Sequence, residues 1–309
     1  MTRHETFSLA IPAERVHPVT PRIGAEIRGV ALAGDLLEET VLAIEALLLR
    51  HKVLFFRGQT HLDNAAQESF ARRLGALVPH PTQAVVTGTD SVLELDSRRG
   101  GGRADRWHTD VTFVEAYPKA SVLRGVVIPP VGGDTIWANT ATAYSDLPEP
   151  LRVLADGLRA VHSNAYDYAG QRPRASEADR RHHAEVFASE VYETEHPVVR
   201  IHPETGEKVL VLGSFVQRIA GLSREESQKI LEILQSYVTA PENTVRWRWQ
   251  AGDVVIWDNR ATQHVAVNDY GDAPRVVRRV TIQGDIPVGP DGRPSTALTK
   301  PRAQGRSKE

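Results

Sequence analysis

The chain has 309 residues, the length of one large domain or of two average ones. Its net charge of −2, with acidic and basic side chains interspersed, excludes the basic surface that binds nucleic acid or an anionic membrane. It has no cysteine, which excludes disulfides, thiolate nucleophiles, iron–sulfur clusters and cysteine-ligated zinc. Any metal ion must therefore be held by His, Asp or Glu.

The hydropathy of the chain carries no sign of a membrane. No stretch approaches the roughly 18 uninterrupted apolar residues that a membrane span needs. Residues 1–18 are polar and charged and lack the apolar run of a signal peptide. We therefore expect a cytoplasmic protein with no membrane partner and no nucleic-acid partner.

Apolar residues at helical spacing predict three main helices, at about 36–50, 63–74 and 224–237. Asp35 is placed to cap the first helix, and Ser223 with Glu226 forms a capping box for the last. Short helical turns are expected near 141–157. The polar stretch 170–190 is expected to be an exposed helical insertion.

Short apolar runs broken by Gly and Pro predict strands at 16–32, 52–57, 121–138, 209–212, 244–249, 254–257 and 275–283. No repeat or linker divides the chain. We therefore expect a single domain over 1–309, mostly β with flanking helices, in a sandwich or barrel. Residues of about 1–15 and 288–309 are expected to be flexible tails. The Gly- and Arg-rich stretch 98–106 fits either a lid over a site or a plain surface loop.

The first candidate site residues are His108 and Asp110, two positions apart. On an extended strand this spacing puts both side chains on one face. With His264 from a distant strand they form a facial set of two imidazoles and one carboxylate. Non-haem Fe(II) oxygenases use this set because it leaves positions open for an oxoacid and O2. A lone His-x-Asp pair also fits a surface ion pair, so the surrounding residues must distinguish the two.

Two arginines on the last predicted strand favour the metal site. Arg275 and Arg279 share one face of an extended strand, whereas Arg278 points to the other. Their apolar neighbours indicate burial, and a buried guanidinium needs an anionic partner. Two such arginines near a metal can hold two anionic groups by bidentate contact.

Four strings in combination resemble a known family. They are W-H-T-D-V-T-F at 107–113, G-G-D-T-I-W-A-N at 132–139, W-D-N-R-A-T-Q-H at 257–264 and R-V-V-R-R-V-T at 275–281. They are similar to those of the Fe(II)/2-oxoglutarate dioxygenases of the taurine dioxygenase family, and most of all to its alkylsulfatase branch. The resemblance covers about residues 16–287 and implies a double-stranded β-helix, or jelly roll, with flanking helices.

The resemblance also implies a role for each matched residue. The implied Fe(II) ligands, which are also the catalytic residues, are His108, Asp110 and His264. The implied contacts with the distal carboxylate of 2-oxoglutarate are Thr135 and Arg275. The implied substrate contacts are His80 and Arg279, on a sulfate or sulfonate group, and Val111 beside it.

The implied reaction is oxidative cleavage of an alkyl sulfate ester to an aldehyde and inorganic sulfate, with succinate and CO2 formed from 2-oxoglutarate and O2. The resemblance also implies a homo-oligomer, either a dimer or a tetramer. Other interpretations stay open, namely a dioxygenase acting on taurine, another sulfonate or a carboxylated aromatic ether, a non-catalytic metal-binding jelly-roll module, and a structural protein. The sequence does not decide between a sulfate ester and a sulfonate, nor the length of the alkyl chain.

Overall fold

The computed structural model describes residues 10–99, 104–165 and 177–299. Its helices are η1 (Ala13–Arg15), α2 (Glu38–His51), α3 (Asn64–Arg73), α4 (Thr140–Asp146), α5 (Glu149–Asp156), α6 (Glu177–His182), η2 (His183–Phe187), α7 (Arg224–Val238) and η3 (Pro241–Asn243). Its strands are β1 (Val16–Pro18), β2 (Ala25–Ile27), β3 (Val53–Phe56), β4 (Leu93–Asp96), β5 (Ala120–Val127), β6 (Thr135–Asn139), β7 (Arg159–Ser163), β8 (Glu193–Pro197), β9 (Val199–Ile201), β10 (Lys208–Leu210), β11 (Val216–Ile219), β12 (Thr244–Trp247), β13 (Val254–Asp258), β14 (Thr262–Ala266), β15 (Val276–Ile282) and β16 (Thr296–Ala297).

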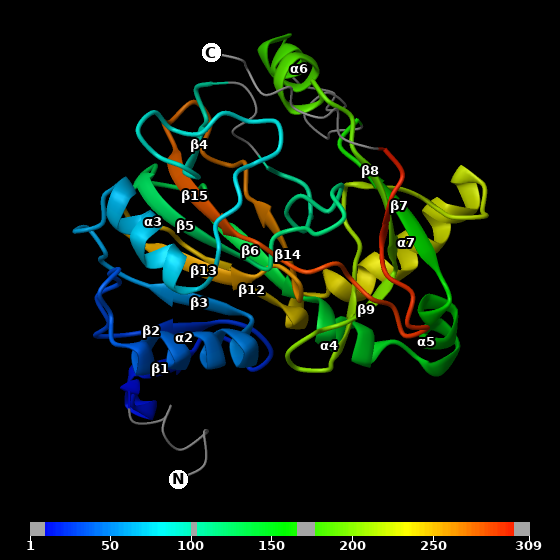
Figure 1. The fold of residues 1–309 in the computed structure, drawn as a ribbon, viewed down its shortest axis with the longest axis horizontal. Coiled ribbons are helices and arrows are strands. Elements are labelled where there is room, and N and C mark those ends of the chain that lie inside the picture. Colours follow the sequence, from blue (N-terminus) through cyan, green and yellow to red (C-terminus); the bar gives the residue numbers. More distant parts are fainter. Residues whose placement is uncertain (1–9, 100–103, 166–176, 300–309) are drawn as a thin grey trace, which may run out of the picture.

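Two sheets pack against each other around an aromatic core (Figure 1). The larger sheet has the order β1-β2-β3-β13-β5-β15-β4, and the smaller has the order β12-β6-β14. Phe55 of β3 stacks on Trp247 of β12 with ring centroids 4.1 Å apart, and Trp137 of β6 lies 5.8 Å from Trp257 of β13. The predicted fold class, mostly β with flanking helices in a jelly roll, is confirmed.

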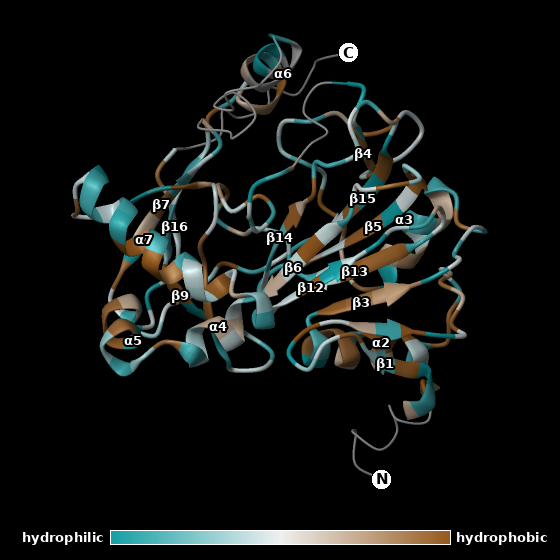
Figure 2. Ribbon diagram, turned by 180° about the vertical axis from the view of Figure 1, so that it is seen from behind, coloured by the Kyte–Doolittle hydropathy of each residue, from teal (hydrophilic) through white to brown (hydrophobic). Residues whose placement is uncertain are grey.

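The alternation of side chains explains why β3 and β13, two central strands of the larger sheet, are almost entirely apolar. In β13, Val255 and Trp257 point into the aromatic core between the sheets. Val254 and Ile256 point to the other face, where they pack in a second core with side chains of α2 and α3. Because successive side chains of a strand point to opposite faces, a sheet covered on both sides needs apolar residues at every position. In Figure 2, β3 is mostly brown, the colour of hydrophobic residues.

The three predicted main helices are confirmed as α2, α3 and α7. Ser223 accepts a hydrogen bond from the backbone N–H of Glu226 and forms the predicted capping box of α7. The predicted cap of α2 is wrong. That helix begins one residue after Leu37, and no side chain caps it. Its first turn instead carries Glu38 and Glu39, whose charges favour a helix N-terminus.

A third sheet, β11-β7-β8-β16, and the pair β10-β9 lie beside the two main sheets (Figure 1). Helices α4, α5 and α7 contribute to a separate apolar cluster there. Strand β7 pairs with β11, whose preceding residue Phe215 turns towards the candidate site described below. This part of the fold therefore forms a second wall of that site.

Some expectations at the ends of the chain stay predictions. Residues 10–15 include η1, and residues 288–299 include β16, which pairs with β8. Residues 1–9 and 300–309 lie outside the described residues, as do 166–176 of the expected insertion and 100–103 of the Gly-rich stretch. In the part of the chain that the structure describes, no helix is long and apolar enough to cross a membrane.

Candidate active site

The backbone of β14 brings the two candidate histidine ligands together. His264 lies on this strand, and His108 forms an isolated bridge with it. The N–H of each residue donates to the carbonyl oxygen of the other, at 3.0 and 2.8 Å. The imidazole ring centroids are therefore only 4.2 Å apart, although the two residues are distant in the sequence.

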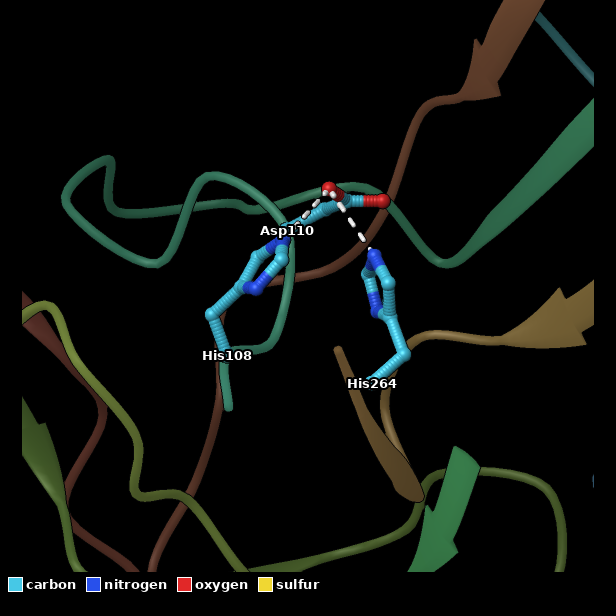
Figure 3. A group of neighbouring side chains, drawn as sticks. All are labelled: His108, Asp110 and His264. Carbon is cyan, nitrogen blue, oxygen red and sulfur yellow. Dashed lines mark ion pairs between the residues drawn. The ribbon is translucent and has the colours of Figure 1, made fainter. Parts of the chain in front are cut away.

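Asp110 reaches the same point from a turn and not from an extended strand, so the predicted local structure is wrong. A turn begins at Asp110, and Val111 adopts a positive φ of 59°. Asp110 Oδ1 then lies 3.8 Å from Nε2 of His108 and 3.9 Å from Nε2 of His264 (Figure 3). The predicted set of three donors nevertheless converges, with its ligand atoms all within 4.8 Å of one another.

The protonation of these three side chains suits a divalent metal. Burial raises the pKa of Asp110, but the Arg279 guanidinium and then the two imidazoles hold this pKa below its ordinary value. Burial lowers the pKa of His264 well below its ordinary value, so the ring is neutral at pH 7. Nδ1 of His108 is 2.7 Å from the Arg106 carbonyl oxygen, which fixes its proton there and leaves the Nε2 lone pair for a metal. The residues therefore fit the Fe(II) set predicted from the sequence.

Arg275 and Thr135 meet on the side of the site nearest β6. The Nε–H of Arg275 donates to the Gly133 carbonyl at 3.0 Å, and its Nη2 lies 3.5 Å from the Thr135 hydroxyl. Trp249 also donates to that hydroxyl, at 2.9 Å. A Cβ on Gly133 would lie 3.1 Å from the Arg275 side chain, and its φ is +73°, so this position of the G-G-D-T string favours glycine. Burial lowers the pKa of Arg275, and Tyr270 and Asp134 offset part of this effect, while the oxygens to which Arg275 donates are neutral.

Arg279 lies on β15 and points to the metal ligands. Its Nη1 donates to Asp110 Oδ1, while its buried Nε has no hydrogen-bond partner among the described residues. Arg278 points to the opposite face of the sheet, where it pairs with Glu94 at 2.8 Å. The predicted division of these arginines between two faces is confirmed, and the anionic partner predicted for a buried arginine is, for Arg279, the Asp110 carboxylate.

His80 lies next to this group as a neutral ring. Burial, and then the charge of Arg279, lower the pKa of His80 to about 3. The backbone N–H groups of Thr82 and Gln83 donate to its Nδ1, at 3.3 and 3.2 Å. Because Nδ1 is the acceptor, the proton of the neutral ring is on Nε2. His80 can therefore donate a hydrogen bond to an anion, without being a cation itself.

An apolar cluster lies against both His80 and His108. It comprises Val111, Phe113 and Phe215, which are buried, with Val114, Phe187 and Tyr192 packed against them. The ring of His80 lies 5.7 Å from Phe187, and the ring of His108 lies 6.0 Å from Phe215. Val111 thus belongs to an apolar cluster beside the candidate ligands, and its predicted contact with a substrate stays a prediction.

The sequence did not reveal four residues that contact this site. Phe187, at the end of η2, and Phe215, in a turn, are far in the sequence from the candidate metal ligands, and a single apolar residue in such a place carries no signal. Ser121 and Asn259 form hydrogen bonds with Asp110. Of these two, only Asn259 had a signal in the sequence, because it belongs to the W-D-N-R-A-T-Q-H string that ends in His264.

Comparison with known proteins identifies the family to which this site belongs. A family model described as "Taurine catabolism dioxygenase TauD, TfdA family" matches residues 15–281. The chain belongs to the TauD/TfdA dioxygenase family. The family predicted from the four sequence strings is thereby confirmed.

Two curated relatives of this dioxygenase share most of its length. An "Alpha-ketoglutarate-dependent sulfate ester dioxygenase" of Pseudomonas putida is 64% identical over 92% of this chain and 94% of its own. An "Alkylsulfatase" of Acinetobacter baylyi is 57% identical over 90% of this chain and 87% of its own. The names of both relatives agree with the branch predicted from the sequence. The crystal structure of a taurine dioxygenase from Burkholderia xenovorans superposes with a TM-score of 0.77 at 42% identity, over 92% of this chain and 96% of that one.

Proposed function

We propose that this dioxygenase uses Fe(II), 2-oxoglutarate and O2 to cleave alkyl sulfate esters. The observation that carries the proposal is the convergence of the metal-ligand set with two buried arginines. Arg279 lies on the metal side, bonded to Asp110, and Arg275 lies beside Thr135. The names of the two curated relatives, both sulfate ester enzymes, support the same substrate class.

In this proposal His108, Asp110 and His264 hold the iron. Bound Fe(II) supplies the activation of O2, coupled to oxidative decarboxylation of 2-oxoglutarate to succinate and CO2. The three ligand side chains are buried, none being more than 6% exposed, so bulk water has little access to them. The Asp110 carboxylate would offset only one of the two positive charges of bound Fe(II), and the site would then be net positive, which suits an anionic co-substrate.

Arg275 and Thr135 bind the distal carboxylate of 2-oxoglutarate in this proposal. A guanidinium with neutral partners in a buried position is stabilised by an arriving carboxylate, because the charge-assisted hydrogen bond offsets the cost of desolvation. The Thr135 hydroxyl can donate to that carboxylate while it accepts from Trp249. Both groups are held in place by their bonds to neighbouring strands, so little reorganisation is needed on binding.

The sulfate ester is recognised by His80 and Arg279, and its hydrocarbon part by the apolar cluster around Val111. His80 Nε2 donates a hydrogen bond, and Arg279 supplies the positive charge. The aromatic rings of Phe113, Phe187 and Phe215 offer dispersion contacts to an alkyl chain. The carbon that bears the sulfate oxygen then lies between the two anion-binding residues, His80 and Arg279, and the bound iron.

The proposed reaction balances as a hydroxylation followed by elimination. The carbon that bears the sulfate oxygen loses a hydrogen and gains a hydroxyl, one oxygen atom of O2 entering there and the other entering succinate. The resulting hemiacetal sulfate ester loses its hydroxyl proton as the C–O bond to sulfate breaks. An aldehyde, inorganic sulfate and one proton leave.

A substrate panel tests the proposal. The purified protein is supplied with Fe(II), ascorbate, 2-oxoglutarate and, in turn, alkyl sulfates, taurine and aryloxyacetates. Succinate and free sulfate are measured together. We expect succinate and sulfate in equal amounts with alkyl sulfates only. Succinate formed with taurine but not with alkyl sulfates would contradict the proposal and indicate a sulfonate substrate. The absence of succinate with every substrate would favour a non-catalytic metal-binding module.

A further inference from the structure

The Asp110 ligand is held at three points by two residues that the donor set does not include. Its backbone N–H donates to Asn259 Oδ1 at 2.9 Å, and Asn259 Nδ2 donates back to the Asp110 carbonyl at 3.1 Å. The same Nδ2 donates to the Pro118 carbonyl at 2.9 Å. Ser121 Oγ donates to Asp110 Oδ2 at 2.8 Å. Asn259 is 1% exposed and Ser121 is 0% exposed, so water does not compete for the hydrogen bonds of either side chain.

These bonds make the two carboxylate oxygens unequal. Oδ2 accepts from Ser121 and points away from the histidines. Oδ1 accepts from Arg279 Nη1 and lies 3.8 and 3.9 Å from the two imidazole Nε2 atoms (Figure 3). A turn of the carboxylate about its last torsion, out of its present plane, breaks the bond to Ser121 and leaves a buried hydroxyl unpaired, which costs about 1–3 kcal/mol. The bond to Ser121 therefore holds the plane of the carboxylate.

The backbone beneath this carboxylate is strained. Val111, the next residue, has a φ of 59°, a conformation that costs a β-branched residue about 1–3 kcal/mol. Such a turn persists only if its surroundings hold it. The paired bonds between Asn259 and the backbone of Asp110 lie directly before the strained residue and can hold it.

The strand pairing of the larger sheet places both residues. Ser121 on β5 pairs with Trp257 on β13, and Asn259 follows the end of β13. The backbone N–H of Asn259 donates to the Lys119 carbonyl at 2.9 Å, which ties that end to the start of β5. Two neighbouring strands of a rigid sheet therefore present Asn259 and Ser121 to one loop.

We propose that Asn259 and Ser121 are positioning residues of the metal site. Asn259 fixes the turn that carries Asp110, and Ser121 fixes the rotation of its carboxylate, so that a single oxygen is offered to the metal. The inference rests on the proposed function, which assigns Asp110 as a ligand. A carboxylate that offers one oxygen occupies one position on the metal and keeps the others available for 2-oxoglutarate and O2.

Metal binding without turnover tests this role. Ser121→Ala and Asn259→Ala are titrated with Mn(II) by calorimetry and with Co(II) by visible absorption, in the absence of 2-oxoglutarate. Loss of an outer partner of a metal ligand weakens binding roughly 10–100-fold, and we expect both variants in this range. The Co(II) absorption of Ser121→Ala should also change in intensity, because its carboxylate is free to offer both oxygens. Ser121→Thr keeps the hydroxyl and should restore affinity and spectrum.

The chain offers a matched control for each variant. Ser227 is a buried serine whose hydroxyl donates to the Ser223 carbonyl and accepts from the N–H of Ile219, and Asn243 is a buried asparagine that donates to two backbone carbonyls. Ser227→Ala and Asn243→Ala remove equivalent bonds away from the metal ligands. We expect both controls to lose thermal stability and to bind Mn(II) as the wild type does.

The outcomes separate this inference from the proposed function. Wild-type Mn(II) affinity and an unchanged Co(II) spectrum in Ser121→Ala would overturn the positioning role, while sulfate release by the wild type would still stand. Equal affinity losses in Ser227→Ala or Asn243→Ala would also overturn it, because they would trace the loss to general destabilisation. A wild type that binds no divalent metal would overturn the metal site itself.

Discussion

The buried histidine of β8 makes the stability of this dioxygenase sensitive to acid. His196 is fully buried, with its Nε2 2.7 Å from the Thr112 carbonyl and its Nδ1 2.6 Å from the Ser295 hydroxyl. Burial is the main reason that its pKa falls from 6.5 to about 3, and Arg200 and Arg159 lower it further. Thr112 follows Asp110 by two residues, so this histidine contacts the turn that carries the proposed metal ligand.

The size of this pH effect on the free energy of unfolding follows from the pKa of His196 in the unfolded and in the folded state. The folded state binds the proton less tightly than the unfolded state, so the stabilising contribution is complete above pH 6.5 and is lost as the pH falls towards 3. At pH 5.0 the loss is about 2 kcal/mol, from a pKa of about 6.5 unfolded and about 3 folded. His162, whose ring lies 4.9 Å away and whose pKa is also lowered by burial, adds in the same direction.

The perturbation is His196→Gln, which keeps a donor for the Thr112 carbonyl and removes the titrating group. Urea unfolding is measured at pH 7.5 and pH 5.0 in the presence of a chelator, so that metal release does not contribute. We expect the variant to have a lower free energy of unfolding than the wild type at pH 7.5, because packing is lost. Between pH 7.5 and pH 5.0, however, its free energy of unfolding should fall by about 2 kcal/mol less than that of the wild type. His17→Gln on the edge strand β1 is the control and should lose as much as the wild type. A His196→Gln variant with the full wild-type loss would refute the reasoning.

Four further predictions concern the site itself. Asp110→Ala should lose iron-dependent turnover, and full activity without added iron would contradict its role. Thr135→Val should raise the KM for 2-oxoglutarate about tenfold, the effect of roughly one lost hydrogen bond, with a smaller change for alkyl sulfate; equal changes in steady-state kinetics would reject this contact. Arg279→Ala should impair alkyl sulfate more than 2-oxoglutarate binding, while Arg278→Ala on the other face of the sheet should affect neither. Phe187→Ala should raise the KM for long alkyl sulfates and leave that for 2-oxoglutarate unchanged, and an unchanged chain-length profile would remove it from the substrate site.

The sequence by itself determined the identity of the chemistry. The absence of cysteine left only His, Asp and Glu as ligands, and the four strings named a family in which each ligand position is specified. The main helices and the central strands also followed from local patterns, because the period of apolar residues reflects which face is buried. The assembly of copies of this chain into a homo-oligomer stays a prediction.

The tertiary structure decided how those residues meet. The sequence predicts that His108 and Asp110 share a strand face, yet Asp110 lies in a turn with a strained neighbour. No local pattern could reveal this, because the backbone of Asp110 bonds to Asn259, which is distant in the sequence, and its carboxylate bonds to Ser121 on another strand. The aromatic wall of the site was hidden for the same reason.

Local patterns record what each segment buries. The contacts that orient a ligand come from long-range strand pairing, and only the folded chain brings those partners within hydrogen-bonding distance.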